Sequence, residues 1–294
     1  MDLKSYLSNS CQRVDDWLDT NLPAEAQVPV SLHKAMRHSV FAGGKRLRPV
    51  LCLAAAEALG NSTDDVLPLA GALECLHTFT LIHDDLPCMD DDDFRRGKPT
   101  CHKVYGEAVA VLAGDALQAV AFEMVCRFKS EHNPYDAADF TTELAIAAGS
   151  LNVVAGQVMD LEGEGRDLSF DELRAIHLRK TASLLCTSIR FGAMAGKADP
   201  AQLEAMTTFG HSLGLAFQVI DDILDTTQTT EQLGKTAGKD EAVGKATYPA
   251  ILGLEASRAE AQRLTADAKA ALSIFGDQAQ RLNEIADYML DRDY

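Results

Sequence analysis

The sequence lacks several features that would place it in other classes of protein. No run of about eighteen apolar residues occurs, and the Ala/Val-rich stretch 108–122 is interrupted by Asp115, so a membrane-spanning helix is not expected. Positive charge is scarce, with 27 Lys and Arg against 44 Asp and Glu, and the resulting net charge of −17 argues against non-specific nucleic-acid binding. The N-terminal residues contain no apolar segment typical of a secretory signal.

Disulfide and sheet signatures are also missing. The seven cysteines are odd in number and scattered, with no Cys-x-x-Cys pair, which favours reduced thiols and a cytoplasmic protein. Only nine prolines occur, and alternating β-branched runs are nearly absent. These absences argue against both a disulfide-stabilised domain and a β-sheet protein.

What the sequence has instead is a helical pattern along almost its whole length. Apolar residues recur at spacings of three and four, as in Val66, Leu69 and Leu73. The breaks between such segments are too short and too weakly biased in composition to be domain linkers. We therefore expect residues 1–294 to form a single all-α domain, a bundle of about ten helices.

One stretch, LIHDDLPCMDDDDFRRG (81–97), contains six aspartates within ten positions. Like charges at this spacing repel and raise one another's pKa, so we expect a cation to bind there. Pro87 disturbs the helix after Asp84 and Asp85, and Asp90 follows six residues after Asp84. The Pro-containing insertion must turn the chain back if Asp90 is to share a site with the other two.

A second acid group occurs in FQVIDDILD (217–225). Asp221 and Asp225 are four residues apart and share a helix face with Gln218. The preceding residues are mostly apolar, which predicts a buried helix, and buried carboxylates need a cation. The likeness of this stretch to the segment before Asp84 suggests that two helices bring acid pairs to a common place.

The residue types narrow the choice of cation. No register supplies the alternating acids and the glycine of a Ca²⁺-binding EF-hand, or the closely spaced His and Cys of a zinc site. A di-iron bundle needs Glu-x-x-His twice, and only Glu74-x-x-His77 matches. Carboxylates that leave room for water and phosphate oxygens suit Mg²⁺, which usually bridges to a phosphorylated substrate.

Basic residues flank both acid groups, although no Walker A loop is present. They fall in three islands, GGKRLRP before the first acid group, RR directly after it, and a lysine-containing segment after the second: Lys45, Arg46 and Arg48; Arg95 and Arg96; Lys235, Lys239 and Lys245. Guanidinium and ammonium groups beside metal-binding acids are expected where a diphosphate lies between them.

Taken in order, these motifs resemble the trans-prenyl diphosphate synthases, most closely those of the bacterial farnesyl type. The resemblance covers nearly the whole chain, in the segments GGKRLRP (43–49), HTFTLIHDDLPCMDDDDFRRG (77–97), AGDAL (113–117), GQVMDL (156–161), RKT (179–181), FQVIDDILD (217–225), LGK (233–235) and GKATYP (244–249). It implies a helical fold around a central cavity that both acid motifs line. It also implies a homodimer, for which the apolar helix 105–126 is the expected interface.

The resemblance further implies roles for single residues. Three Mg²⁺ ions, with Mn²⁺ as an alternative, would be bound by Asp84, Asp85, Asp90, Asp221, Asp222 and Asp225. Isopentenyl diphosphate would be bound by Lys45, Arg48, His77 and Arg96. The allylic diphosphate would be contacted by Arg95, Lys180, Thr181, Gln218, Lys235 and Lys245, and the catalytic residues among these would be Lys180, Thr181 and Gln218.

Product length is expected to depend on Phe79 and Thr80, five and four residues before Asp84, where relatives form the pocket floor. A Phe at this position resembles farnesyl synthases, so the expected product is (2E,6E)-farnesyl diphosphate, made from isopentenyl diphosphate with dimethylallyl and then geranyl diphosphate. The alternative is a geranylgeranyl diphosphate synthase. An inactive partner subunit or a terpene cyclase is disfavoured, because both acid motifs are complete. Ala155 and Ala182 replace glycines that many relatives have.

Overall fold

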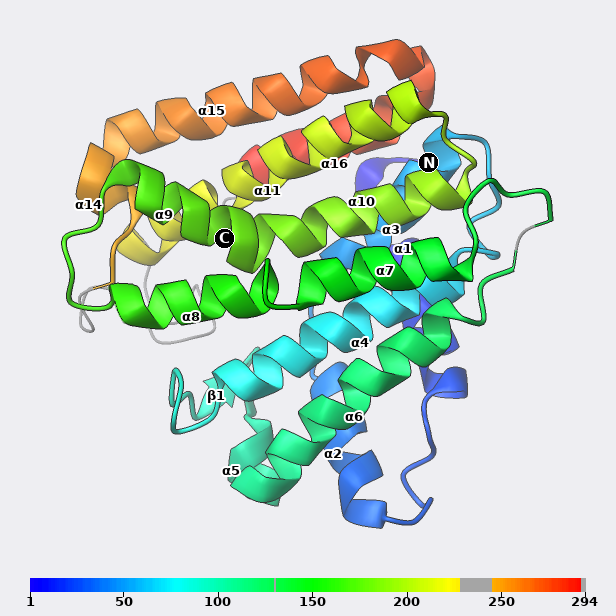
Figure 1. Ribbon diagram of the computed structural model, residues 1–294, viewed down its shortest axis with the longest axis vertical. Helices are drawn as coiled ribbons and strands as arrows, with labels where there is room; N and C mark the ends of the chain where they lie inside the picture. The colour runs from blue at the N-terminus through cyan, green and yellow to red at the C-terminus, as the bar shows by residue number, and fades with distance from the viewer. Residues whose placement is uncertain (130, 228–244, 292–294) are drawn as a thin grey trace.

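The computed structural model describes residues 1–129, 131–227 and 245–291, and these residues are helical almost throughout (Figure 1). The helices are α1 (Leu3–Asn21), α2 (Val30–Val40), α3 (Leu47–Ala58), α4 (Leu67–Asp84), α5 (Cys101–Tyr105), α6 (Glu107–Val125), α7 (Ala137–Ala148), α8 (Val153–Gly163), α9 (Phe170–His177), α10 (Ser183–Ala195), α11 (Pro200–Thr227), α14 (Tyr248–Leu252), α15 (Leu254–Ala271) and α16 (Gln280–Leu290), with a π-helical turn η1 (Leu178–Ala182) and a 3₁₀ segment η2 (Leu272–Ala279). The all-α fold predicted from the apolar spacing is confirmed.

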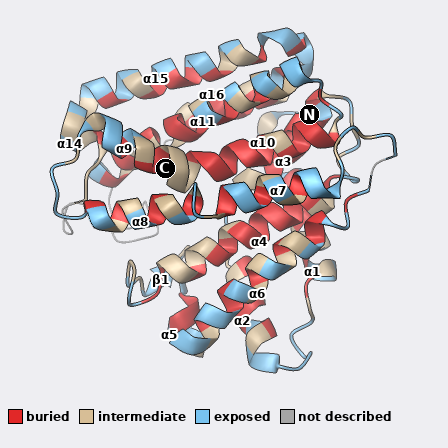
Figure 2. Cartoon of the chain, in the orientation of Figure 1, coloured by how far each residue is buried: buried red, intermediate tan, exposed pale blue. Residues whose placement is uncertain are grey.

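The core lies along three central helices, α3, α4 and α10, which are buried on nearly all sides (Figure 2). A helix that is apolar all round must be covered by other helices. α4 packs against α6 and α3, while α10 packs against α3 and α11. This arrangement partly or fully buries Asp84, Asp221 and Asp225 in the last turns of α4 and α11.

Local sequence explains where the two acid-bearing helices run. α4 has Pro68 in its first turn, a position that needs no amide donor, and it ends at Asp84, three residues before Pro87. α11 begins at Pro200 and continues for 28 residues, with its buried residues spaced along one side as far as Asp225. Each helix therefore delivers its aspartates in its last turns.

A short hairpin follows the first acid group and was not predicted from the sequence. Strands β1 (Phe94–Arg95) and β2 (Lys98–Pro99) pair antiparallel around a two-residue loop. Both loop residues, Arg96 and Gly97, have positive φ angles, of 53° and 74°, as a type I′ turn requires. A two-residue strand carries too little alternation to be recognised in sequence, yet this turn fixes the direction of Arg95 and Arg96.

Two stretches of the described chain are long and apolar enough to cross a membrane by length and composition: Glu107–Val125 and Ala137–Gly163. In the most apolar 18 residues of each stretch, 39% of the first and 33% of the second are buried against the rest of the protein. The first is α6, which packs on α4 and α2, and the second comprises both α7 and α8. Both stretches are thus helices of the bundle that also present apolar residues outward.

Candidate active site

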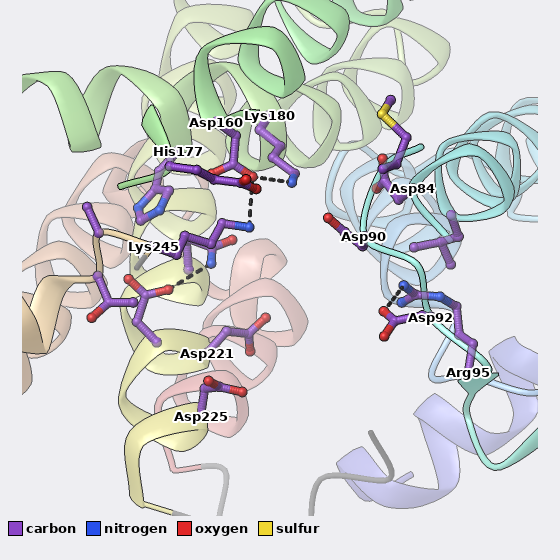
Figure 3. Close-up of a pocket in the computed structure, with 17 residues that line it drawn as sticks. Asp84, Asp90, Asp92, Arg95, Asp160, His177, Lys180, Asp221, Asp225 and Lys245 are labelled. Carbon is purple, nitrogen blue, oxygen red and sulfur yellow. Dashed lines mark hydrogen bonds and ion pairs between the residues drawn. The ribbon is translucent and has the colours of Figure 1, made fainter. Parts of the chain in front are cut away.

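The aspartates of the two motifs meet across one cavity of about 340 Å³ (Figure 3). Asp84 and Asp90 lie on one side, and Asp221 and Asp225 lie opposite them on α11. The backbone N–H of Asp90 donates to the carbonyl of Asp84 at 2.8 Å, so the Pro-containing loop does return Asp90 to the end of α4. The structure therefore brings together the two acid groups that the sequence placed more than 130 residues apart.

The electrostatics of Asp84 fit a cation site. Burial raises the pKa of Asp84 to about 6, and the carboxylates of Asp90 and Asp85 act in the same direction, against the opposing charges of Lys180 and Arg95. A carboxylate in this situation is stabilised when a cation joins it. The aspartate carboxylates, in a cavity that also contains Lys and Arg, suit Mg²⁺ better than a metal that prefers nitrogen or sulfur.

Among the predicted metal-binding acids, Asp85 and Asp222 accept hydrogen bonds from neighbouring protein groups. Asp85 accepts from Arg95 Nε at 2.7 Å, and its side chain is almost fully buried. Burial raises the pKa of Asp85, and the hydrogen bond from Arg95 opposes this. Asp222 accepts from the backbone N–H of Tyr248 at 3.0 Å and from Gln218 Nε2 at 2.9 Å. Both carboxylates thus position their neighbours as well as contributing negative charge.

A hydrogen-bonded chain links two of the predicted catalytic residues, Thr181 and Gln218. The hydroxyl of Thr181 donates to Gln218 Oε1 at 2.9 Å, and the Gln218 amide in turn donates to Asp222. Thr181 and Lys180 lie in the π-helical turn η1, a distortion that is frequent at functional sites. The turn directs both side chains toward the cavities that α11 lines.

Asp160 on α8 holds two of the predicted diphosphate-binding lysines (Figure 3). Its Oδ2 accepts from Lys180 Nζ at 2.6 Å and from Lys245 Nζ at 2.8 Å. Burial alone would raise the pKa of Asp160, but the two lysines outweigh it and lower the pKa. His177 lines the same cavity, and burial lowers its pKa to about 3, so its imidazole is neutral. The positive charge here therefore comes from the lysines.

A second cavity, of about 570 Å³, adjoins the first and shares Asp84, Arg95 and Lys180 with it. Arg48, His77 and Arg96 line its basic part. Burial lowers the pKa of Arg48 to about 10 and that of His77 well below its ordinary value, so the arginines carry the charge beside a neutral imidazole.

The GGKRLRP loop and the hairpin meet at this basic part. Arg96 donates to the carbonyl of Gly43, and a methyl group placed on Gly44 would collide with the Arg96 guanidinium. Gly44 also has a φ of +121°, which few other residues adopt. The paired glycines thus allow Arg96 to approach the loop that precedes α3, the helix that carries Arg48.

The rest of the second cavity is mainly apolar, with Thr80 and Gln157 among its polar residues. Phe79 and Thr80 line it from α4, and their part in limiting product length stays a prediction. The remaining apolar lining comes mainly from α8 and α11: Val153, Val154, Val158, Leu161 and Phe217. A charged chamber therefore opens into an apolar one, an arrangement suited to a ligand with a diphosphate head and a hydrocarbon tail.

Some residues differ from expectation. Lys45 lines a separate cavity of about 130 Å³ with residues of α1 and α16, and neither of the two main cavities includes it. Lys235 lies outside the described residues. Arg46 is buried and bonds to Glu74 at 2.8 Å and to Asp15 at 2.7 Å, so it supports the basic loop, and Glu74 has the wrong partner for a di-iron ligand.

Asp160 is a functional residue for which the sequence left direct substrate contact as open as a helix-capping or supporting role. The sequence feature that points to Asp160 is the segment GQVMDL. In the structure, Gly156 of this segment is packed so closely that an added methyl would collide with the Lys180 backbone. The structure accommodates the two alanines that replace glycines of many relatives. Ala155 is only partly buried, and the Ala182 methyl packs against Gly214, where the absence of a side chain makes room.

An all-α fold in which two aspartate motifs face each other across a cavity that also contains basic residues defines a class of protein, the helical prenyltransferases. The profile of the polyprenyl synthetase family matches residues 29–285, and the chain belongs to this family. The expected family is therefore confirmed.

Curated relatives and solved structures agree at this level. The chain is 47% identical over 297 residues to the large subunit 1 of a chloroplastic heterodimeric geranylgeranyl pyrophosphate synthase of Arabidopsis thaliana, covering 99% of this chain and 80% of that protein. It is 46% identical to the chloroplastic geranylgeranyl pyrophosphate synthase of Capsicum annuum, with 99% and 79% covered. An apo FPP/GFPP synthase of Zymomonas mobilis superposes with a TM-score of 0.88 at 36% identity, covering 98% of both chains. A Helicobacter pylori geranyltransferase complexed with magnesium and isoprenyl diphosphate gives 0.85 at 33% identity, covering 99% of this chain and 97% of that one.

Proposed function

We propose that this prenyltransferase condenses isopentenyl diphosphate with an allylic diphosphate and so lengthens a trans-prenyl chain by one isoprene unit. The observation that carries the proposal is the cavity pair, in which Asp84 and Asp221 face each other beside cationic side chains and an apolar chamber. The magnesium and isoprenyl diphosphate of the Helicobacter pylori neighbour support the same reading of the acids.

The allylic diphosphate belongs in the chamber between the acid motifs. The acids that would hold Mg²⁺ there are Asp84, Asp90, Asp221 and Asp225, with Asp85 and Asp222 behind them. Bound Mg²⁺ supplies charge neutralisation of the departing diphosphate without proton transfer. Arg95, Lys180 and Lys245 line the same chamber and would donate to the diphosphate oxygens, while Lys235 stays a prediction for the same role.

Ionisation of the allylic C–O bond leaves a carbocation, which needs electron-rich dipoles and a dry wall. Thr181 and Gln218, fixed by their mutual hydrogen bond, present their oxygens where the two cavities adjoin. The apolar chamber around Phe79 receives the growing tail and excludes water.

The second substrate belongs at the basic part of the larger cavity. Arg48 and Arg96 would bind the diphosphate of isopentenyl diphosphate, with the neutral His77 as a hydrogen-bonding neighbour. Lys45 stays a prediction for this role. The double bond then attacks the carbocation, and the released diphosphate takes the proton that the condensed product loses.

On product length, the curated relatives favour geranylgeranyl diphosphate over the farnesyl diphosphate predicted from the sequence. We therefore put geranylgeranyl diphosphate first. One observation favours the farnesyl product: the Phe79 ring lines the apolar chamber, where a large side chain leaves less room for a longer tail.

The test is incubation of the purified protein with isopentenyl and dimethylallyl diphosphates and Mg²⁺, followed by dephosphorylation and chromatographic sizing of the products. We expect geranylgeranyl or farnesyl alcohol, and loss of both with a chelator or in Asp221→Asn. The absence of any elongated product with dimethylallyl, geranyl or farnesyl diphosphate as the primer would overturn the proposal.

We further propose that the protein acts as a homodimer in the cytoplasm. Half-exposed or exposed apolar residues follow α6, α7 and α8, which pack side by side: Val111, Leu112, Ile146, Leu151, Val154 and Val158. An apolar face this long is expected to be covered by protein. The seven free cysteines support a reducing compartment.

A further inference from the structure

His83, which immediately precedes the first aspartate, lies in the wall of the apolar chamber and contacts Phe79. The two residues are four apart on α4 and therefore share a face of the helix. Their ring centroids are 4.8 Å apart with the planes at 79°, an edge-to-face contact. Both side chains line the chamber of about 570 Å³.

The His83 ring is also bonded to α6. His83 Nε2 lies 3.1 Å from the carbonyl oxygen of Val111, which can only accept, so the imidazole donates its Nε2–H there. The ring enters a notch at Gly114, where an added methyl would collide with Nε2 and Cδ2 of the imidazole. Gly114 belongs to the AGDAL segment, for which the proposed reaction has no other use. The imidazole thus spans the space from α6 to the Phe79 ring.

We propose that His83, seated in the Gly114 notch, sets the position of the Phe79 ring and thereby limits the length of the prenyl tail that the chamber accepts. His83 is a positioning residue for specificity: it acts through Phe79 and touches no reacting atom. The proposal rests on the proposed function and adds to it a determinant outside the two positions, Phe79 and Thr80, expected from the sequence. It predicts opposite shifts from two substitutions on facing helices.

Removing the imidazole frees the Phe79 ring to swing into the vacated space. We expect His83→Ala to raise the ratio of longer product to the main wild-type product by about tenfold, the discrimination usual for one or two methylene-sized steps of a hydrophobic pocket. A methyl group at Gly114 forces the ring toward Phe79, so Gly114→Ala is expected to shift the products one isoprene unit shorter. Product sizing after incubation with isopentenyl and dimethylallyl diphosphates and Mg²⁺ measures both.

Three further variants separate positioning from general disruption. His83→Phe keeps a flat ring of similar size and should restore the wild-type product length. The double variant Phe79→Ala with His83→Ala should give the same products as Phe79→Ala alone, because His83 acts through Phe79. Asp115→Asn removes the exposed carboxylate 3.9 Å from His83 Nε2 without changing the space, and should leave product length unchanged.

The inference is overturned if His83→Ala and Gly114→Ala both give the wild-type product pattern, or if both shift it in the same direction. If circular dichroism shows that Gly114→Ala does not fold, equal product lengths from His83→Ala and His83→Phe are enough to overturn the inference. Calorimetric affinities for thiolo-diphosphate analogues with geranyl, farnesyl and geranylgeranyl tails give a readout independent of turnover. A wild-type protein that makes no product therefore counts against the proposed function, while the tail-length preference of the variants still judges this inference.

Discussion

Asp84, one of the proposed metal-binding carboxylates, carries a raised pKa. Burial and the neighbouring acids Asp90 and Asp85 raise its pKa to about 6, whereas its ordinary value is 3.8. The folded protein therefore binds the Asp84 proton more tightly than the unfolded chain does. It follows that the contribution of Asp84 to stability is present at low pH and is lost as the pH rises from about 4 to about 6.

The first prediction concerns this residue in metal-free protein. Asp84→Asn removes the buried charge, so the free energy of unfolding at pH 7 should rise by about 1–3 kcal/mol, with little change at pH 4. Urea denaturation in a chelator measures both values. The control is Asp91→Asn, in the same loop but exposed, which should change neither. Equal stability of wild type and Asp84→Asn at pH 7 would contradict the prediction.

Asp160 supports a second prediction, because it is a shared acceptor for Lys180 and Lys245. Charge-assisted hydrogen bonds of this kind contribute about 1.5–3 kcal/mol each, so Asp160→Asn should lower kcat/KM for the allylic substrate by about 10- to 100-fold. The KM for isopentenyl diphosphate should stay the same, since its proposed site lies around Arg48. Steady-state kinetics with each substrate varied in turn measures kcat/KM for the allylic substrate and KM for isopentenyl diphosphate.

Glu162→Gln is the matched control for Asp160→Asn. Glu162 is an exposed acid two residues further along α8, and its substitution should leave kcat/KM unchanged. If both variants lose activity equally, the effect belongs to the net charge of α8 and not to the lysine pairing.

At the residue scale, the sequence predicts best where a regular helix joins the residues concerned. The spacing of Gln218, Asp221 and Asp225 needs only 3.6 residues per turn to place them on one face. The position of Asp90 was harder to predict, because it depends on backbone hydrogen bonds of a loop, among them the 2.8 Å bond to the Asp84 carbonyl. Asp160 could not be assigned, since both of its lysine partners are distant in sequence.

At the scale of elements, the decisive contact is that between α8 and the π-helical turn η1. Gly156 of α8 lies so close to η1 that a methyl group would collide with the Lys180 backbone nitrogen and lie 2.7 Å from its Cα. Backbone atoms cannot turn aside as a side chain does. The position of Lys180 and Thr181 thus depends on a missing side chain in the neighbouring helix.

A third prediction weighs two opposing effects at Gly156. Helix propensity favours alanine by about 1 kcal/mol, but overpacking against rigid backbone costs about 1–3 kcal/mol and displaces the turn. We expect Gly156→Ala to lower kcat more than about tenfold, since small misplacements of catalytic groups are costly. Ala155→Gly, next to it and only partly buried, should lose about 1 kcal/mol of stability with kcat retained. Wild-type kcat in Gly156→Ala would contradict this account.

The sequence predicted the helices but not their irregularities. A π-turn inserts one residue into an otherwise continuous periodic pattern, and in the sequence α9, η1 and α10 follow one another without a break. The hairpin after the first acid group escaped prediction for a different reason, because its strands have two residues each. Both features carry basic side chains to the cavity, so the parts that sequence missed are the ones that aim functional groups.

At the scale of the whole molecule, the outer face of α6, α7 and α8 remains apolar although the bundle is complete. Leu112 is 58% exposed and Leu151 is 70% exposed, while the half-exposed Val154 and Val158 also line the apolar chamber. The same face contains both stretches whose composition would suit a membrane span. Cover by a second copy of the chain removes this surface from water and closes the chamber wall, which links the proposed dimer to the proposed reaction.

The last prediction tests that link. Placing charges on the face, in Leu112→Asp combined with Leu151→Asp, should convert a particle of two 31.7 kDa chains into one of a single chain at micromolar concentration, as measured by sedimentation velocity. Burying an unpaired carboxylate in an apolar interface costs several kcal/mol, enough to dissociate an ordinary dimer. Ile274→Asp, equally exposed at 58% but on η2, should leave the dimer intact. A wild-type monomer, or a double variant that still sediments as a dimer, would show that another surface or another partner covers this face.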